Sequence, residues 1–138
     1  MKALPILRQI LRRIALPLAI VLAAPTAFAL AEAGRAELKV LQGRWADIQY
    51  GLPEKQREAA FAELAARAGK AVAAEPEAAE LHIWHGIILS TWAGAKGGLG
   101  ALDLVKAAKV ELETALKLDA QALDGSAYTS LGSLYYQV

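Results

Sequence analysis

Apolar residues recur at intervals of three and four along most of the chain, the spacing that gives an α-helix one buried face. Two such sets are Leu81, Trp84, Ile88 and Trp92, after Pro76, and Leu104, Ala108, Leu112 and Ala115, after Gly100. Strict alternation of apolar and polar residues, which would indicate a strand, has no run long enough for a sheet. The pattern therefore predicts an all-α fold.

Proline and glycine divide this helical pattern into about five helices after residue 30. The expected breaks are 51–53, 75–76, 94–100 and 123–125. Pro53 precedes Glu54 and Pro76 precedes Glu77, and proline at the first helical position with an acid in the first turn begins a helix well.

One expected helix near the end of the chain carries a recognisable spacing. Tyr128 is followed at fixed intervals by Leu131, Gly132 and Tyr135. An aromatic, then x-x-Leu-Gly-x-x-Tyr, is the pattern of the first helix of a tetratricopeptide unit.

The helix before it carries the spacing of the second helix of that unit. Ala108, Leu112 and Ala115 give Ala-x3-large apolar-x2-Ala. On these two motifs the sequence resembles the tetratricopeptide-repeat family over roughly residues 35–138. The resemblance implies antiparallel helical hairpins stacked as a superhelix, with Gly86 and Gly132 allowing close helix contact.

The repeats are degenerate. Pro76 and Ala120, which occupy equivalent positions, lie 44 residues apart, against a family period of about 34. Most of the excess falls in the glycine-rich stretch 94–100, where we expect a flexible connection. The pairing of first and second helices also leads us to expect further repeat sequence after Val138.

Composition places an export signal before this domain. Four cations, Lys2, Arg8, Arg12 and Arg13, precede an uncharged apolar run at residues 14–24 and the small-x-small sequence at 27–29. These are the three parts of a cleavable signal peptide. We expect residues 1–29 to be removed after Ala29, and the mature protein to be periplasmic, with membrane contact only through the signal.

The charge and the lack of cysteine exclude several functions for residues 30–138. Removing the four signal cations leaves 11 basic residues against 14 acidic ones, a net charge of about −3. No basic cluster is present, so we expect no nucleic-acid partner. The absence of cysteine excludes disulfides, thiolate metal sites and a cysteine nucleophile.

The two histidines are the candidate metal ligands. His82 and His85 can share one helical face, and Glu77 or Glu80 could add a third zinc ligand. Their places in the repeat instead favour helix packing beside Trp84. We therefore expect no metal and no cofactor.

Other candidate chemistry is weaker. Residues 94–100 contain a lysine among glycines but lack the order of a phosphate-binding loop. The serines of the last expected helix have no histidine close in sequence, and Glu111 and Glu113 are expected in solvent. The sequence predicts no catalysis.

The resemblance implies a function through a concave groove. In the family, the inner faces of first helices bind a segment of a partner protein. Transferred by spacing, those positions are Glu80, Ile83, Ile87, Ser90, Ser126, Thr129, Ser133 and Tyr136. We expect a protein-interaction module or scaffold, and the alternative is a solute-handling protein working beside a transporter's solute-binding protein, with Trp84 and Trp92 lining a cavity.

Overall fold

A computed structural model describes residues 29–137, and every regular element in that range is helical. The α-helices are α1 (Glu32–Ala46), α2 (Glu54–Ala74), α3 (Ala79–Lys96), α4 (Leu102–Leu118) and α5 (Ala122–Gln137). A π-helical turn, η2 (Asp47–Gly51), continues α1, and a 3-10 turn, η3 (Leu99–Ala101), leads into α4. The prediction of an all-α fold with five helices is confirmed. The expected signal, apart from Ala29, lies outside the described residues.

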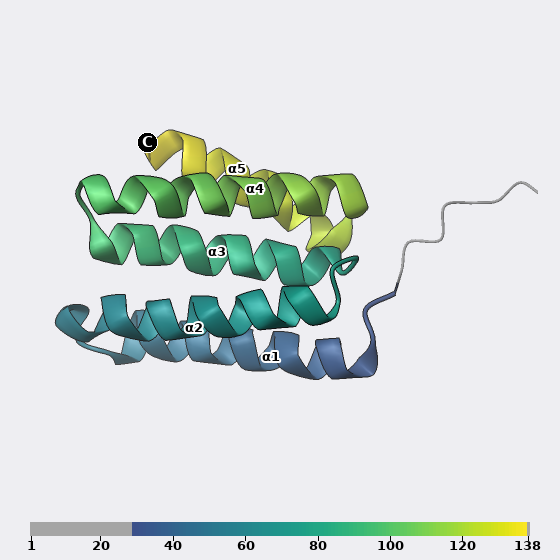
Figure 1. The fold of residues 1–138 in the computed structure, drawn as a ribbon, viewed down its shortest axis with the longest axis horizontal. Helices are drawn as coiled ribbons and strands as arrows, with labels where there is room; N and C mark the ends of the chain where they lie inside the picture. Colours follow the sequence, from purple (N-terminus) through teal and green to yellow (C-terminus); the bar gives the residue numbers. More distant parts are fainter. Residues whose placement is uncertain (1–28, 138) are drawn as a thin grey trace, which may run out of the picture.

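Each α-helix runs antiparallel to the one before it (Figure 1). α3 lies between α2 and α4 and contacts all four of the other α-helices. α1 lies behind α2, and α5 lies behind α4, in the view of Figure 1. α1 and α5 thus flank the same side of α3.

The core forms along both sides of α3. The largest fully buried side chains are Leu41, Ile48, Phe61, Leu81, Ile83, Ile88 and Leu112. Both predicted helix faces are confirmed. Leu81 and Ile88 are buried, with Trp84 and Trp92 half-buried beside them, and Ala108, Leu112 and Ala115 are buried on α4.

The contact between α3 and α4 depends on a glycine. A Cβ at Gly86 would lie 2.7 Å from Leu112 Cγ and 3.1 Å from the carbonyl oxygen of Ala108. Only a residue without a side chain fits this approach. The expectation that Gly86 allows close helix packing is therefore confirmed.

The connection between α3 and α4 is shorter than the sequence predicts. α3 continues through Gly94 to Lys96, so the expected break at residue 94 is wrong by three residues. The chain turns at Gly97 and Gly98, whose φ angles of 64° and 61° favour glycine. Because η3 follows at once, most of the glycine-rich stretch is helical and not a flexible loop.

The start of α5 contains the expected break at residues 123–125. Leu123, Asp124 and Gly125 have φ angles of 49°, 56° and 75°, all in the left-handed region. Farther along, a Cβ at Gly132 would meet nothing within 4 Å. Gly132 therefore makes no close helix contact among the described residues, unlike Gly86.

Candidate functional site

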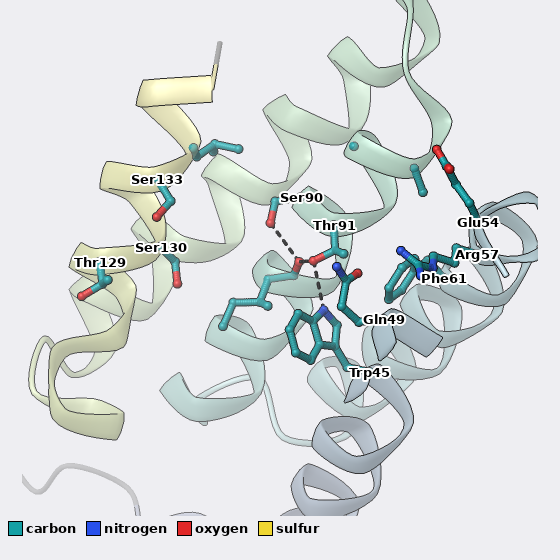
Figure 2. A pocket seen from close by; sticks show the side chains of 14 residues that line it. Trp45, Gln49, Glu54, Arg57, Phe61, Ser90, Thr91, Thr129, Ser130 and Ser133 are labelled. Carbon is teal, nitrogen blue, oxygen red and sulfur yellow. Dashed lines mark hydrogen bonds between the residues drawn. The ribbon is translucent and has the colours of Figure 1, made fainter. Parts of the chain in front are cut away.

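A groove of about 530 Å³ opens on the side of α3 that α1 and α5 flank (Figure 2). Its volume lies in the range of typical ligand sites, about 300–1,000 Å³. From α1, η2 and α2 it is lined by Trp45, Gln49, Glu54, Arg57 and Phe61. From α3 and α5 it is lined by Ile87, Ser90, Thr91, Gly94, Ala95, Thr129, Ser130, Ser133 and Leu134.

Four of the eight residues predicted for a groove line this one: Ile87, Ser90, Thr129 and Ser133. They come from α3 and α5, which supply neighbouring parts of the lining in Figure 2. The structure thus brings together the last two residues of the predicted face on α3 and the middle two of the predicted face on α5.

The other four predicted residues lie elsewhere. Ile83 is fully buried in a cluster with Ala115 and Ala127, so it presents no surface to a partner. Ser126 donates to the carbonyl oxygen of Leu123 at 2.5 Å, across the break at the start of α5. Glu80 and Tyr136 do not line the groove, and Tyr136 is 93% exposed.

The part of the lining that comes from α1, η2 and α2 was not predicted from the sequence. No local spacing relates Trp45 or Arg57 to Ser133, because the groove joins segments far apart in the chain. On α3, however, a signal was present. Continuing the three-and-four spacing from Ile87 gives Thr91 and Gly94, and both line the groove.

The floor of the groove is held by a hydrogen-bonded tryptophan. Trp45 Nε1 donates to Thr91 Oγ1 at 3.0 Å, and Thr91 Oγ1 donates to the carbonyl oxygen of Ile87 at 2.8 Å (Figure 2). The Trp45 ring also packs edge-on against Trp84 and Tyr50, with centroids 6.0 and 5.9 Å apart. Such aromatic pairs and bonds fix the position of Trp45.

Arg57 occupies the end of the groove formed by α2. Its Nε donates to the carbonyl oxygen of Leu52 at 2.9 Å, just after η2. The side chain is half-buried, and no carboxylate of the described residues lies within ion-pair distance of it. Arg57 is therefore a positive group in the groove wall without a counter-ion from the described chain.

A second, more apolar hollow of about 340 Å³ continues the groove toward η3 and α4. It shares Ser90, Gly94 and Leu134 with the groove. Leu99, which lines it, is 95% exposed. The two hollows give the open face of α3 one part of mixed polarity and one mainly apolar part.

The two histidines form a separate cluster inside the α3–α4 contact. His82 Nδ1 lies 2.5 Å from Glu111 Oε2, and His82 Nε2 lies 2.8 Å from the carbonyl oxygen of Pro76. His85 Nδ1 lies 3.2 Å from Glu111 Oε1 without a well-directed hydrogen bond. His82 is buried and His85 half-buried, so the expected packing role is confirmed.

The expectation that Glu111 lies in solvent is wrong. Only 20% of its side chain is exposed, because His82 and His85 of α3 pack over it. The two glutamates named as possible zinc ligands, Glu77 and Glu80, form no such contact with the histidines. Within residues 29–137, no group of three His, Asp or Glu side chains has a metal-binding arrangement.

The contacts within the cluster favour the charged forms of both His82 and Glu111. The hydrogen bond to Glu111 outweighs burial and raises the pKa of His82, and the Pro76 carbonyl adds to this. Burial alone would raise the pKa of Glu111, but the contacts from His82 and His85 lower it to about 2. Since both nitrogens of His82 face acceptors, the doubly protonated ring satisfies both.

No family model, curated protein or solved structure matches this chain. Of the helices in residues 29–137, none is long and apolar enough to cross a membrane.

Proposed function

We propose that this chain is an exported, tetratricopeptide-like interaction module that binds a segment of a partner protein in the groove between α1 and α5, without catalysis. The observation that carries the proposal is the groove itself, to whose lining α1, α3 and α5 all contribute, together with η2 and α2. Helices of first-helix type lining one concave face are what the resemblance implies for a peptide-binding repeat.

The chemistry of the lining supports a segment of protein as the occupant. Hydroxyl groups from Ser90, Thr129 and Ser133 stand near an indole and an apolar stretch of α3. Hydroxyls can both donate and accept, so they suit the alternating N–H and C=O groups of an extended backbone. The adjoining apolar hollow can take a side chain of the same segment.

Export is part of the same proposal. Leu30, which follows the expected cleavage site, is buried in the main core, whereas Ala29 is exposed. Cleavage after Ala29 would thus leave the buried part of the fold intact. The mass of the protein from the exported fraction of its own cells tests this, since removal of residues 1–29 predicts a chain that begins at Leu30.

A groove-filling variant tests the binding function. Ser133→Trp places a large ring in the groove, and Thr114→Trp places one on α4, outside it. Affinity capture from the exported fraction should lose its stoichiometric partner with the first variant and keep it with the second. A partner retained equally by both variants would contradict binding in this groove.

The solute-handling alternative loses its expected support. Trp84 and Trp92 were expected to line a cavity, but both pack against the core, and neither lines the two hollows on the open face of α3. Small molecules that co-purify without a protein partner would favour that alternative over the interaction module.

A further inference from the structure

The groove contains a cation that the described chain leaves without a partner. Arg57 is half-buried, and neither Glu54 of the same wall nor the adjacent Glu58, which pairs with Lys96 at 3.4 Å, is within ion-pair distance of it. Partial burial of a charge costs free energy unless a counter-ion compensates it. A binding site that retains such a charge is suited to an occupant that supplies the opposite one.

The orientation of Arg57 is fixed before any ligand arrives. Its Nε donates a hydrogen bond to the carbonyl oxygen of Leu52, at 2.9 Å. The two terminal nitrogens, Nη1 and Nη2, are left to form the paired hydrogen bonds that a carboxylate accepts from arginine. Because the bond to Leu52 holds the side chain, less rotational freedom is lost on binding.

The opposite wall offers neutral polar groups and no cation. Thr129, Ser130 and Ser133 of α5 line it, and their hydroxyls form no hydrogen bond with other described residues. In Figure 2 they lie across the groove from Arg57 and Glu54. The groove therefore has one end that carries the cation of Arg57 beside Glu54, and one hydroxyl-lined side.

From these features we infer that the groove binds an extended peptide segment whose aspartate or glutamate side chain pairs with Arg57, while its neighbouring backbone groups meet the hydroxyls of α5. The inference rests on the proposed function and names the partner chemistry for the same groove. It assigns to Arg57 the role of the specificity-determining residue.

Glu54 limits how many acids the segment can carry. It lines the same end of the groove as Arg57. A second carboxylate beside it would be repelled, and like charges placed together cost affinity. One acidic residue between neutral ones is the occupant that this wall fits, and Glu54→Gln should tighten its binding.

The test uses two pools of blocked peptides with the residues 30–138 form of the protein. Each pool has an acetylated start, an amidated end, three mixed neutral residues on each side of a central position and a neutral dye. The central residue is Glu in one pool and Gln in the other. Fluorescence anisotropy should give about tenfold tighter binding of the Glu pool, as expected for hydrogen bonds to a charged group.

Matched variants test whether Arg57 causes the preference for the Glu pool. Arg57→Gln should reduce the preference for the Glu pool to about equal binding, and Arg57→Lys should keep only part of it. Arg44→Gln removes an arginine of α1 that pairs with Asp47 outside the groove, and it should leave the preference unchanged. Circular dichroism of each variant reports whether the helices are retained.

The outcomes separate this inference from the proposed function. Equal binding of both pools by the unmodified protein would overturn the pairing of an acidic side chain with Arg57. It would not contradict the proposed interaction module. If Arg57→Gln still prefers the Glu pool, the acidic side chain pairs with another residue, and this would also overturn the inference. Failure of both pools to bind at millimolar concentration would overturn the groove as a peptide site altogether.

Discussion

Glu111 on α4 accepts a hydrogen bond from His82 on α3 at 2.5 Å, and the other nitrogen of the same ring lies 2.8 Å from the carbonyl oxygen of Pro76. One imidazole thus connects α4 with the turn between α2 and α3. The negative charge of Glu111 and the positive charge of His82 stabilise each other in a half-buried place.

The pH dependence of stability should follow from this pair. The pKa of His82 is raised, so its contribution is complete below its ordinary value of 6.5 and is lost as pH rises through the folded value. The pKa of Glu111 is lowered to about 2, so its contribution is complete above 4.5 and is lost below it. Urea unfolding across pH should show greatest stability between about 4.5 and 6.5. A His82→Gln variant should lose the decline above that window, and an unchanged decline would assign it to other groups.

Glu111→Gln should destabilise the fold by about 1–3 kcal/mol, because two histidines then lose a charged partner inside the α3–α4 contact. Glu113→Gln is the matched control on the same helix. Glu113 pairs with Lys109 at 3.7 Å on the exposed side, where such a pair contributes about 0–1 kcal/mol. Equal effects of the two variants in urea unfolding would show that the histidine cluster does not stabilise the helix contact.

Gly86→Ala and Gly132→Ala should have opposite effects. The Cβ at position 86 meets Leu112 and should cost about 1–3 kcal/mol through overpacking. The Cβ at position 132 meets no atom of the described residues within 4 Å, so the higher helix propensity of alanine should stabilise the fold by up to about 1 kcal/mol. Thermal unfolding monitored by circular dichroism distinguishes these directions, and a loss at both positions would mean that α5 packs more closely than described.

Thr91→Val should weaken the floor of the groove. It removes the acceptor of the Trp45 indole N–H, at a cost of about 1 kcal/mol. Thr114→Val is the control, because among the described residues the Thr114 hydroxyl bonds only to the carbonyl oxygen of Val110 in its own helix. Tryptophan fluorescence should shift in the first variant alone, and an unchanged spectrum would indicate that Trp45 is held by its aromatic contacts.

Local spacing predicted the parts of the fold that depend on one helix or on two adjacent ones. The buried faces of α3 and α4 and the close approach at Gly86 belong to this class, because periodicity and a missing side chain report on them directly. The motif in α5 has the spacing of the first helix of a tetratricopeptide unit, yet its Tyr128 and Tyr135 are 58% and 60% exposed. A motif specifies which face is apolar, but not whether a neighbour covers it.

The candidate site was predictable only in part, for a related reason. Ser90 and Ser133 were found because each lies on a predicted helix face. Arg57 and Trp45 were not, since their roles arise when α1 and α2 fold against α3, and no spacing along the chain encodes that contact. Glu111 was misplaced in solvent because helix periodicity alone does not identify the residue it meets on another helix.

The central place of α3 has a consequence for how the protein opens. Every other α-helix packs against α3, so α1 or α5 can detach from it singly, whereas α3 can be released only when the whole fold separates. Amide hydrogens of α3 should therefore exchange with solvent most slowly, with a protection that corresponds to the free energy of global unfolding. α5 forms one wall of the groove and α1 contributes Trp45 to it, so the shape of the groove can fluctuate while the part formed by α3 remains folded.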